Sequence, residues 1–150
     1  MKIYYWAPFL SNIATIDSVI NSIRSIQKYD IEKKIDPFIV NVTGEWTEKK
    51  EKLRNINIIN LFHKPYFKNL PKGGIIYSRI SQILIFIFNF IKLKNLLKQN
   101  KPDYFVAHLI ISLPLLLFFL FSFETKLILR ISGFPKLNFL RKFFWSKFSK

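Results

Sequence analysis

The sequence predicts an α/β domain in which helices cover both faces of a parallel sheet. Short β-rich runs alternate with helical segments along the 150 residues, and this alternation is typical of parallel strands joined by crossover helices. Residues 101–133 show it best, because the runs Tyr104–Ala107 and Lys126–Ile131 flank the apolar segment Leu109–Phe123. Half of the residues are hydrophobic, which is enough for the core of one domain. We therefore expect a three-layer, Rossmann-like domain over residues 1–150.

The first part of the chain contains three expected strands, at Lys2–Trp6, Ile35–Val42 and Ile56–Phe62. A helix is expected between the first two strands, because hydrophobic residues recur there at helical spacing. These residues are Ile16, Val19, Ile20, Ile23 and Ile26. Thr15 or Asn12 is expected to cap the start of this helix.

Three further helices and one long loop complete the predicted elements. Trp46–Arg54 predicts a short charged helix, His63–Gly74 a loop, and Ile75–Asn100 one long helix that is apolar on nearly every side. Leu137–Lys150 predicts a final basic and aromatic helix. No strand follows this last helix, so we expect the chain to be the amino-terminal part of a longer protein.

The carboxyl ends of parallel strands meet at one edge of a sheet, and ligands of open α/β sheets bind beyond that edge. We therefore expect five segments that are far apart in the sequence to lie close together in the fold. They are Pro8–Asn12, Gly44–Glu45, His63–Lys64, His108 and Ser132–Gly133.

Four residues at these strand ends suit a phosphate or a sugar. Ser11 and Asn12 precede a helix start, where free N–H groups favour a phosphate or a hydroxyl, although simple helix capping explains them equally well. Gly44 is expected to supply a permissive turn. Glu45 can accept hydrogen bonds from a hydroxyl-rich ligand, or it can be an ordinary surface carboxylate.

His108 and Arg130 are the strongest single candidates. A histidine at the end of a buried strand can orient a substrate or act as a base, and the alternative is a core histidine with satisfied hydrogen bonds. Arg130 lies in a run of Leu and Ile, where an unused charge is costly. Followed by Ser132 and Gly133, it can bind an anionic ligand, or it can form a structural salt bridge. His63 has no evident partner, and we assign it no role.

Several kinds of site have no support in the sequence. The two histidines and the scattered carboxylates have no metal-ligand spacing, and no nucleophile, base and acid set stands out. The glycine patterns G-x-G-x-x-G and G-x-x-x-x-G-K-[ST] are also missing. Without cysteine, the chain can form neither a disulfide nor a thiolate metal site.

The net charge of +15 predicts an anionic partner. In the final helix Lys142, Trp145 and Lys147 mix basic and aromatic side chains, as residues at a membrane surface do, although a second domain packed there would also explain them. The sequence leaves two alternatives. In the first, Ile75–Ile91 and Tyr104–Phe123 form a membrane-spanning hairpin, although burying Arg79 and His108 in the bilayer would cost free energy. In the second, the positive charge binds nucleic acid, although the sequence contains no nucleic-acid-binding motif.

Four stretches in order resemble the amino-terminal half of a family 4 glycosyltransferase: MKIYYWAPF, VTGEW, KPDYFVAHL and RISGFPKLNFLRKFFW. The resemblance covers Met1–Lys150. It implies the GT-B architecture, in which two Rossmann-like domains face each other, and transfer of a sugar from a nucleotide-sugar with retention of configuration. The chain would be the acceptor-binding half and inactive alone, since most of the nucleotide-sugar binds to a carboxyl-terminal domain that this sequence lacks.

The resemblance also implies roles for particular residues and partners. His108 would lie near the reacting centre, and the loop Pro8–Asn12 would border the donor phosphates. Many members have a glycine pair in that loop, where this chain has Phe9-Leu10-Ser11-Asn12. The nucleotide-sugar would be a substrate, with no cofactor or metal expected. Members that build envelope polysaccharides act on lipid-linked acceptors, so the resemblance implies a peripheral protein on the cytoplasmic face of the cell membrane.

Overall fold

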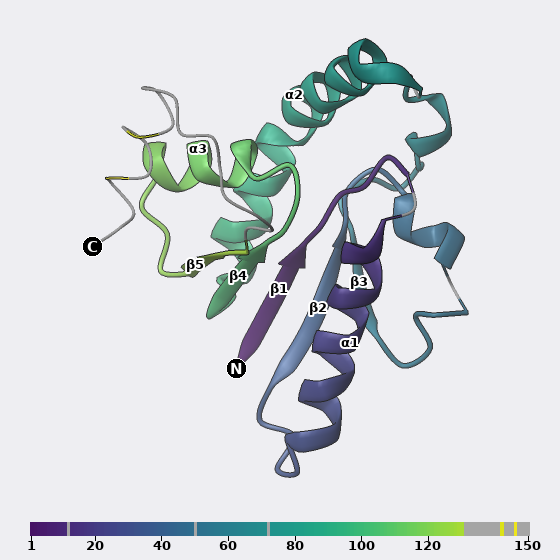
Figure 1. Ribbon diagram of the computed structural model, residues 1–150. Coiled ribbons are helices and arrows are strands. Elements are labelled where there is room, and N and C mark those ends of the chain that lie inside the picture. Colours follow the sequence, from purple (N-terminus) through teal and green to yellow (C-terminus); the bar gives the residue numbers. More distant parts are fainter. Residues whose placement is uncertain (12, 50, 72, 131–141, 143–145, 147–150) are drawn as a thin grey trace.

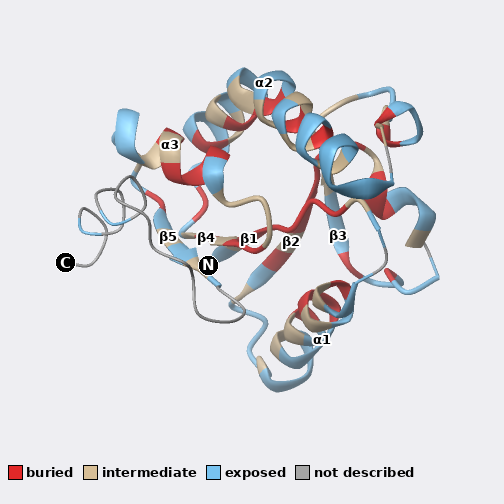
Figure 2. Cartoon of the chain, turned by 45° about the horizontal axis from the view of Figure 1, so that its top comes forward, coloured by how far each residue is buried: buried red, intermediate tan, exposed pale blue. Residues whose placement is uncertain are grey.

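The computed structural model of the chain describes residues 1–11, 13–49, 51–71, 73–130, 142 and 146 (Figure 1). Five parallel strands form one sheet in the order β3-β2-β1-β4-β5. The strands are β1 (Lys2–Trp6), β2 (Asp36–Asn41), β3 (Asn57–Asn60), β4 (Tyr104–Ala107) and β5 (Lys126–Leu129). The helix α1 (Ala14–Tyr29) covers one face of the sheet, and α2 (Gly74–Asn100) and α3 (Ser112–Leu120) cover the other (Figure 2). The predicted three-layer, Rossmann-like α/β fold is confirmed.

The central strand β1 is the most deeply buried part of the sheet. Tyr4, Tyr5 and Trp6 are all at most 4% exposed, and β1 pairs with β2 on one side and with β4 on the other. A strand covered by helices on both faces contacts apolar groups on both sides, so it needs no alternation of polar and apolar residues. This explains the continuous aromatic run that opens the sequence.

The helix α1 forms as its spacing predicts, with Ile16, Val19, Ile20 and Ile23 buried against the sheet. The predicted cap at Thr15 is wrong. The helix begins at Ala14, its N-cap position is Ile13, and no side chain caps it. The other candidate cap, Asn12, lies outside the described residues.

The predicted helix Trp46–Arg54 is also wrong. A 3-10 helix, η1 (Glu45–Lys49), is present instead, and turns follow it in the described residues up to Asn55. The backbone hydrogen bonds from Thr47 to Gly44 and from Lys52 to Lys49 span three residues, whereas those of an α-helix span four. The backbone N–H of Trp46 donates to Asn41 Oδ1 at 3.1 Å, and the Glu45 carboxylate accepts from the backbone of Val42 and Thr43. These contacts hold the start of η1 against the end of β2.

Hydrogen bonds connect the loop before α2 to the segment after β2 and to α2 itself. The carbonyl of Thr43 accepts hydrogen bonds from the backbone N–H groups of Tyr66 and Phe67, at 2.8 and 2.9 Å. Phe67 belongs to a short 3-10 helix, η2 (Phe67–Asn69). The amide of Asn89 on α2 donates to the Tyr66 hydroxyl at 2.7 Å. The middle of α2 therefore packs on this loop.

The predicted long helix is confirmed within one residue, but the membrane-spanning hairpin is not formed. Among the described residues only α2 is long and apolar enough to cross a membrane. The second arm of the hairpin, Tyr104–Phe123, is instead the strand β4 followed by α3, whose nine residues are too few to cross a bilayer. Of the predicted final helix, only Lys142 and Ser146 are described, and both are helical.

Candidate functional site

The strand order creates a switch point between β1 and β4. From β1 the chain passes through α1 to β2, and from β3 it passes through α2 to β4 on the opposite side of β1. The two connections leave the sheet in opposite directions, so a crevice opens at the carboxyl ends of these neighbouring strands. The start of α1, which follows β1, and His108, which follows β4, border this crevice.

A cavity of about 200 Å³ lies at this point. Its lining residues come from α1 and from the ends of β4 and β5: Ala14, Thr15, Ser18, His108, Leu109 and Arg130. The structure thus brings together His108 and Arg130, which are far apart in the sequence and were both predicted as site residues. The start of a helix, with its free N–H groups, completes the wall.

The ring of His108 is buried and lacks a hydrogen-bond partner among the described residues. The residue is 1% exposed, and neither Nδ1 nor Nε2 has a partner. Its backbone N–H donates to the carbonyl of Trp6 at 2.7 Å, and its ring centre lies 6.0 Å from that of Tyr5. Buried polar atoms are nearly always hydrogen-bonded, so this ring, in the wall of a cavity, is available to a ligand.

Burial, and after it the positive charge of Arg130, lower the pKa of His108 from its ordinary value of 6.5 to about 4. The imidazole is therefore neutral at physiological pH. One ring nitrogen then donates a hydrogen bond and the other accepts one. A neutral imidazole of this kind suits a sugar hydroxyl better than it suits a free negative charge.

Arg130 supplies the positive charge of the cavity. Its backbone N–H donates to the carbonyl of Ala107 at 3.0 Å, which extends the pairing of β4 and β5 by one bond. The predicted strand Lys126–Ile131 is too long, because β5 ends at Leu129 and Arg130 is an exposed residue just beyond it. Arg130 forms no ion pair with the described residues, so its guanidinium is available to an anion.

Glu45 is a correction to the predicted site. Its side chain is fully buried, and its carboxylate accepts hydrogen bonds from the backbone N–H of Val42 at 3.2 Å and from the N–H and hydroxyl of Thr43, both at 2.7 Å. Burial raises the pKa of Glu45 above its ordinary value, against the opposing effect of these hydrogen bonds. A carboxylate that is saturated and closed to solvent cannot contact a ligand. Glu45 instead shapes the end of β2.

The other predicted site residues are placed only in part. Ser11 is exposed in the loop after β1, and Gly44 lies beside Pro65 rather than in the His108 cavity. His63 and Lys64 are exposed and do not line that cavity. Lys142 is exposed. The remaining predicted residues lie outside the described part of the chain: Asn12, Ser132, Gly133, Trp145 and Lys147.

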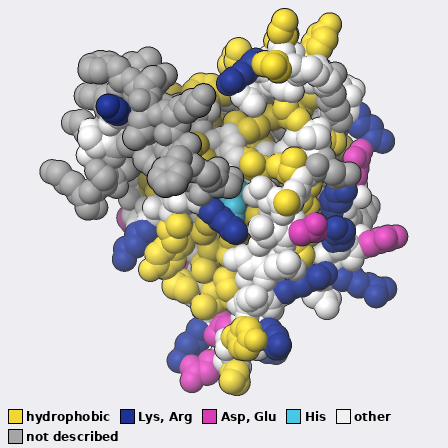
Figure 3. Space-filling model, viewed as in Figure 1, with side chains coloured by type: hydrophobic (Ala, Val, Ile, Leu, Met, Phe, Trp, Pro, Cys, Tyr) yellow, Lys and Arg dark blue, Asp and Glu magenta, His cyan; other side chains and the backbone are white. Residues whose placement is uncertain are grey.

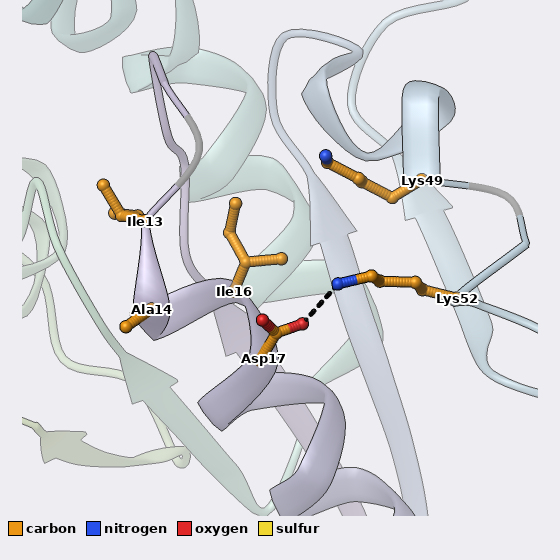
Figure 4. Close-up of a pocket in the computed structure, with 6 residues that line it drawn as sticks. All are labelled: Ile13, Ala14, Ile16, Asp17, Lys49 and Lys52. Carbon is orange, nitrogen blue, oxygen red and sulfur yellow. Dashed lines mark hydrogen bonds and ion pairs between the residues drawn. The ribbon is translucent and has the colours of Figure 1, made fainter.

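A second cavity, of about 320 Å³, lies on the opposite side of the start of α1 (Figure 4). Ala14 lines both cavities, while Lys49 and Lys52 bring positive charge to this one. Lys52 Nζ lies 2.8 Å from Asp17 Oδ1, and this hydrogen bond lowers the pKa of Asp17. Sequence reasoning missed this cavity, because the two lysines were assigned to a regular charged helix.

The described residues contain no cluster of three histidine or acidic side chains that could hold a metal ion. Comparisons of the chain with protein-family models, with curated proteins and with solved structures find no match. The cavity at the switch point and the residues that line it are therefore the features of the fold that bear on function.

Proposed function

We propose that the chain is the acceptor-side, Rossmann-like part of a retaining glycosyltransferase, which transfers a sugar from a nucleotide-sugar to a lipid-linked saccharide. The observation that carries the proposal is the cavity at the switch point of the sheet. There a buried, neutral His108 with no hydrogen-bond partner among the described residues lies near Arg130, whose guanidinium forms no ion pair within the described part of the chain. Hydroxyl and phosphate groups, the two polar parts of a nucleotide-sugar, match these side chains.

In the proposed enzyme Arg130 and the start of α1 attract the phosphates of the donor, since both favour negative charge. His108 hydrogen-bonds a hydroxyl of the sugar close to the bond that is broken. With a pKa of about 4, His108 is a weak base, so its role is to orient the sugar rather than to remove a proton. The cavity of about 200 Å³ is smaller than most ligand sites, so it holds part of the donor, and a second domain would hold the rest.

The proposed acceptor is linked to a lipid at the cytoplasmic face of the cell membrane. The net charge of +15 favours anionic lipids and the pyrophosphate that joins such saccharides to their lipid. Lys and Arg side chains outnumber Asp and Glu on the face of the molecule shown in Figure 3. The proposed partners are thus a nucleotide-sugar, a lipid-linked acceptor and a second, nucleotide-binding domain.

The first test replaces Arg130 with glutamine and measures the binding of uridine diphosphate, guanosine diphosphate and inorganic pyrophosphate by calorimetry. Loss of a charge-assisted hydrogen bond to phosphate is expected to weaken binding roughly tenfold. Lys28→Gln is the matched control, since it removes the same charge from the last turn of α1, at the opposite end of that helix from the cavity. Equal weakening by both variants would mean that only overall charge attracts the ligand, and the proposal would be rejected.

A further inference from the structure

One face of α2 carries an exposed isoleucine stripe. The stripe consists of Ile76, Ile80, Ile83, Ile87 and Ile91. Intervals of three and four residues place all five on the same side of a helix. Their exposed fractions lie between 40% and 74%. The stripe is about 22 Å long at 1.5 Å per residue. In Figure 3 hydrophobic side chains gather at the top of the molecule, over α2.

The outward side of this part of α2 is apolar, although two of the five residues that α2 buries are polar. The side that faces the protein buries two polar residues, Ser81 and Asn89, both at 0% exposure. Ser81 donates to the carbonyl of Pro71, and Asn89 donates to the Tyr66 hydroxyl. A helix at the surface of a soluble protein normally turns its apolar face inward and its polar face outward. Only 17% of the most apolar 18-residue stretch of α2 is buried, so a large apolar surface faces outward.

The charges around the stripe indicate what covers it. No Asp or Glu occurs between Glu51 and Asp103, a segment that includes all of α2. The line of the stripe continues at helical spacing into Lys94 and Lys98, and Arg79 lies one residue before Ile80. An apolar strip accompanied only by positive charges complements a surface that is apolar inside and anionic outside. A bilayer with anionic headgroups has both properties.

The topology indicates that α2 does not cross a bilayer. The strands before and after α2, β3 and β4, belong to the same sheet, so both ends of the helix must be on the same side of a membrane. At 27 residues α2 is about 40 Å long, whereas the six residues of β2 span about 20 Å. The helix therefore extends past the sheet, and Figure 1 shows it beyond the arrowheads of the strands.

We propose that the isoleucine stripe of α2 docks the protein onto an anionic lipid surface. The stripe lies in the membrane interface with Lys94, Lys98 and Arg79 at the level of the headgroups. Beside it a cavity of about 300 Å³ opens between α2 and α3, lined by Arg79, Gln82, Ile83, Phe86 and Ser112. This inference deepens the proposed function, because the start of α2 lies at the same edge of the sheet as the His108 cavity. It rests on the proposed function only for the identity of the acceptor.

The test measures how the full chain binds sedimenting vesicles of phosphatidylcholine and phosphatidylglycerol at low salt. The stripe variant Ile83→Ser/Ile87→Ser keeps the net charge and is expected to weaken binding roughly tenfold or more, since it removes two isoleucines from the lipid contact. Tyr29→Ser/Ile31→Ser is the matched control, because both residues are well exposed at the far end of α1. The control is expected to bind as the unmodified chain does.

Three outcomes would overturn the inference. Equal binding by both variants would mean that the charge of +15 alone attracts the vesicles. If the unmodified chain bound pure phosphatidylcholine vesicles as strongly as vesicles that contain phosphatidylglycerol, anionic headgroups would not be needed for binding. A stripe variant that becomes monomeric where the unmodified chain is a dimer, with unchanged vesicle binding, would identify the stripe as a contact between two copies. Folding of each variant is checked by circular dichroism, and the replaced side chains are exposed, so both should fold.

The two proposals can fail separately. Arg130→Gln is expected to bind vesicles as well as the unmodified chain, because one charge out of 24 Lys and Arg is lost at a distance from the stripe. The stripe variant is expected to bind pyrophosphate normally. Unchanged phosphate binding by Arg130→Gln, with the stripe variant still losing vesicle binding, would therefore reject the glycosyltransferase site alone. Unchanged vesicle binding by the stripe variant, with Arg130→Gln still losing phosphate binding, would reject the docking surface alone.

Discussion

Replacing Gly44 with alanine is expected to lower the free energy of unfolding by roughly 4 kcal/mol, from backbone strain and overpacking together. Gly44 has a φ of +101°, a conformation that residues with a side chain rarely adopt. A Cβ at this position would also collide with the Cβ of Pro65, in a segment held to Thr43 by two backbone hydrogen bonds. Neither side can move away without breaking that attachment.

Gly73→Ala is the control for this experiment. Gly73 has a similar φ of +94°, but nothing lies within 4 Å of the position of its missing Cβ. Only the backbone strain remains, and the expected loss is roughly 1–2 kcal/mol. Urea unfolding of both variants measures the difference. Equal losses would show that the contact with Pro65 contributes nothing and that the backbone conformation explains the whole effect.

Acid is expected to destabilise the fold through His108. Its pKa is about 4 in the folded chain and near 6.5 when unfolded, so the unfolded state binds more protons between these values. The contribution of His108 to stability is therefore complete above pH 6.5 and falls as the pH drops toward 4. The loss reaches roughly 3 kcal/mol at the lower end of this range. Arg130 and the ring of Tyr5, which lie around His108, cannot compensate the new charge.

The measurement compares the unfolding free energy of the unmodified chain with that of His108→Asn across this pH range. Asparagine does not titrate, so the variant is expected to lose less stability on acidification. Glu45 has the opposite effect, because its raised pKa means that the folded state takes up a proton first. This effect is the same in both proteins and cancels in the comparison. Parallel pH profiles would show that His108 is not buried in its uncharged form.

Local patterns predicted most of the elements. The strands Lys2–Trp6 and Tyr104–Ala107 are correct to the residue, because each is a compact β-rich run bounded by clear breaks. The long helix is correct within one residue, since a left-handed Lys101 and then Pro102 end it. The prediction for Trp46–Arg54 failed, because this segment forms a 3-10 helix and turns whose hydrogen bonds span three residues, and the pattern of the sequence does not distinguish these from an α-helix.

The sequence predicted two residues of the candidate site, but it did not predict how they are arranged in space. His108 and Arg130 were identified because both are polar residues in apolar surroundings. His108 and Arg130 are neighbours because β4 pairs with β5, whereas the start of α1 reaches the same cavity only because β1 pairs with β4, across about 100 positions. The sequence also could not predict that the isoleucines on α2 are exposed. When a helix is apolar on nearly every side, its residue pattern does not identify the side that packs on the protein. Burial of Glu45 depends on the loop that folds over it.

The central position of β1 has a consequence for the synthesis of the protein. Ile3 pairs with Tyr104, and the backbone N–H of Lys2 donates to the Asp103 carboxylate at 2.6 Å. Chains are synthesised at about 5–20 residues per second, so β4 is made about 5–20 s after β1, and one edge of β1 stays unpaired during that time. A sheet of β1, β2 and β3 that formed in this interval would leave the backbone of β1 unpaired along one edge. A nascent chain of this protein therefore exposes an aggregation-prone strand, and a chaperone that binds unpaired aromatic strands would protect it until β4 arrives.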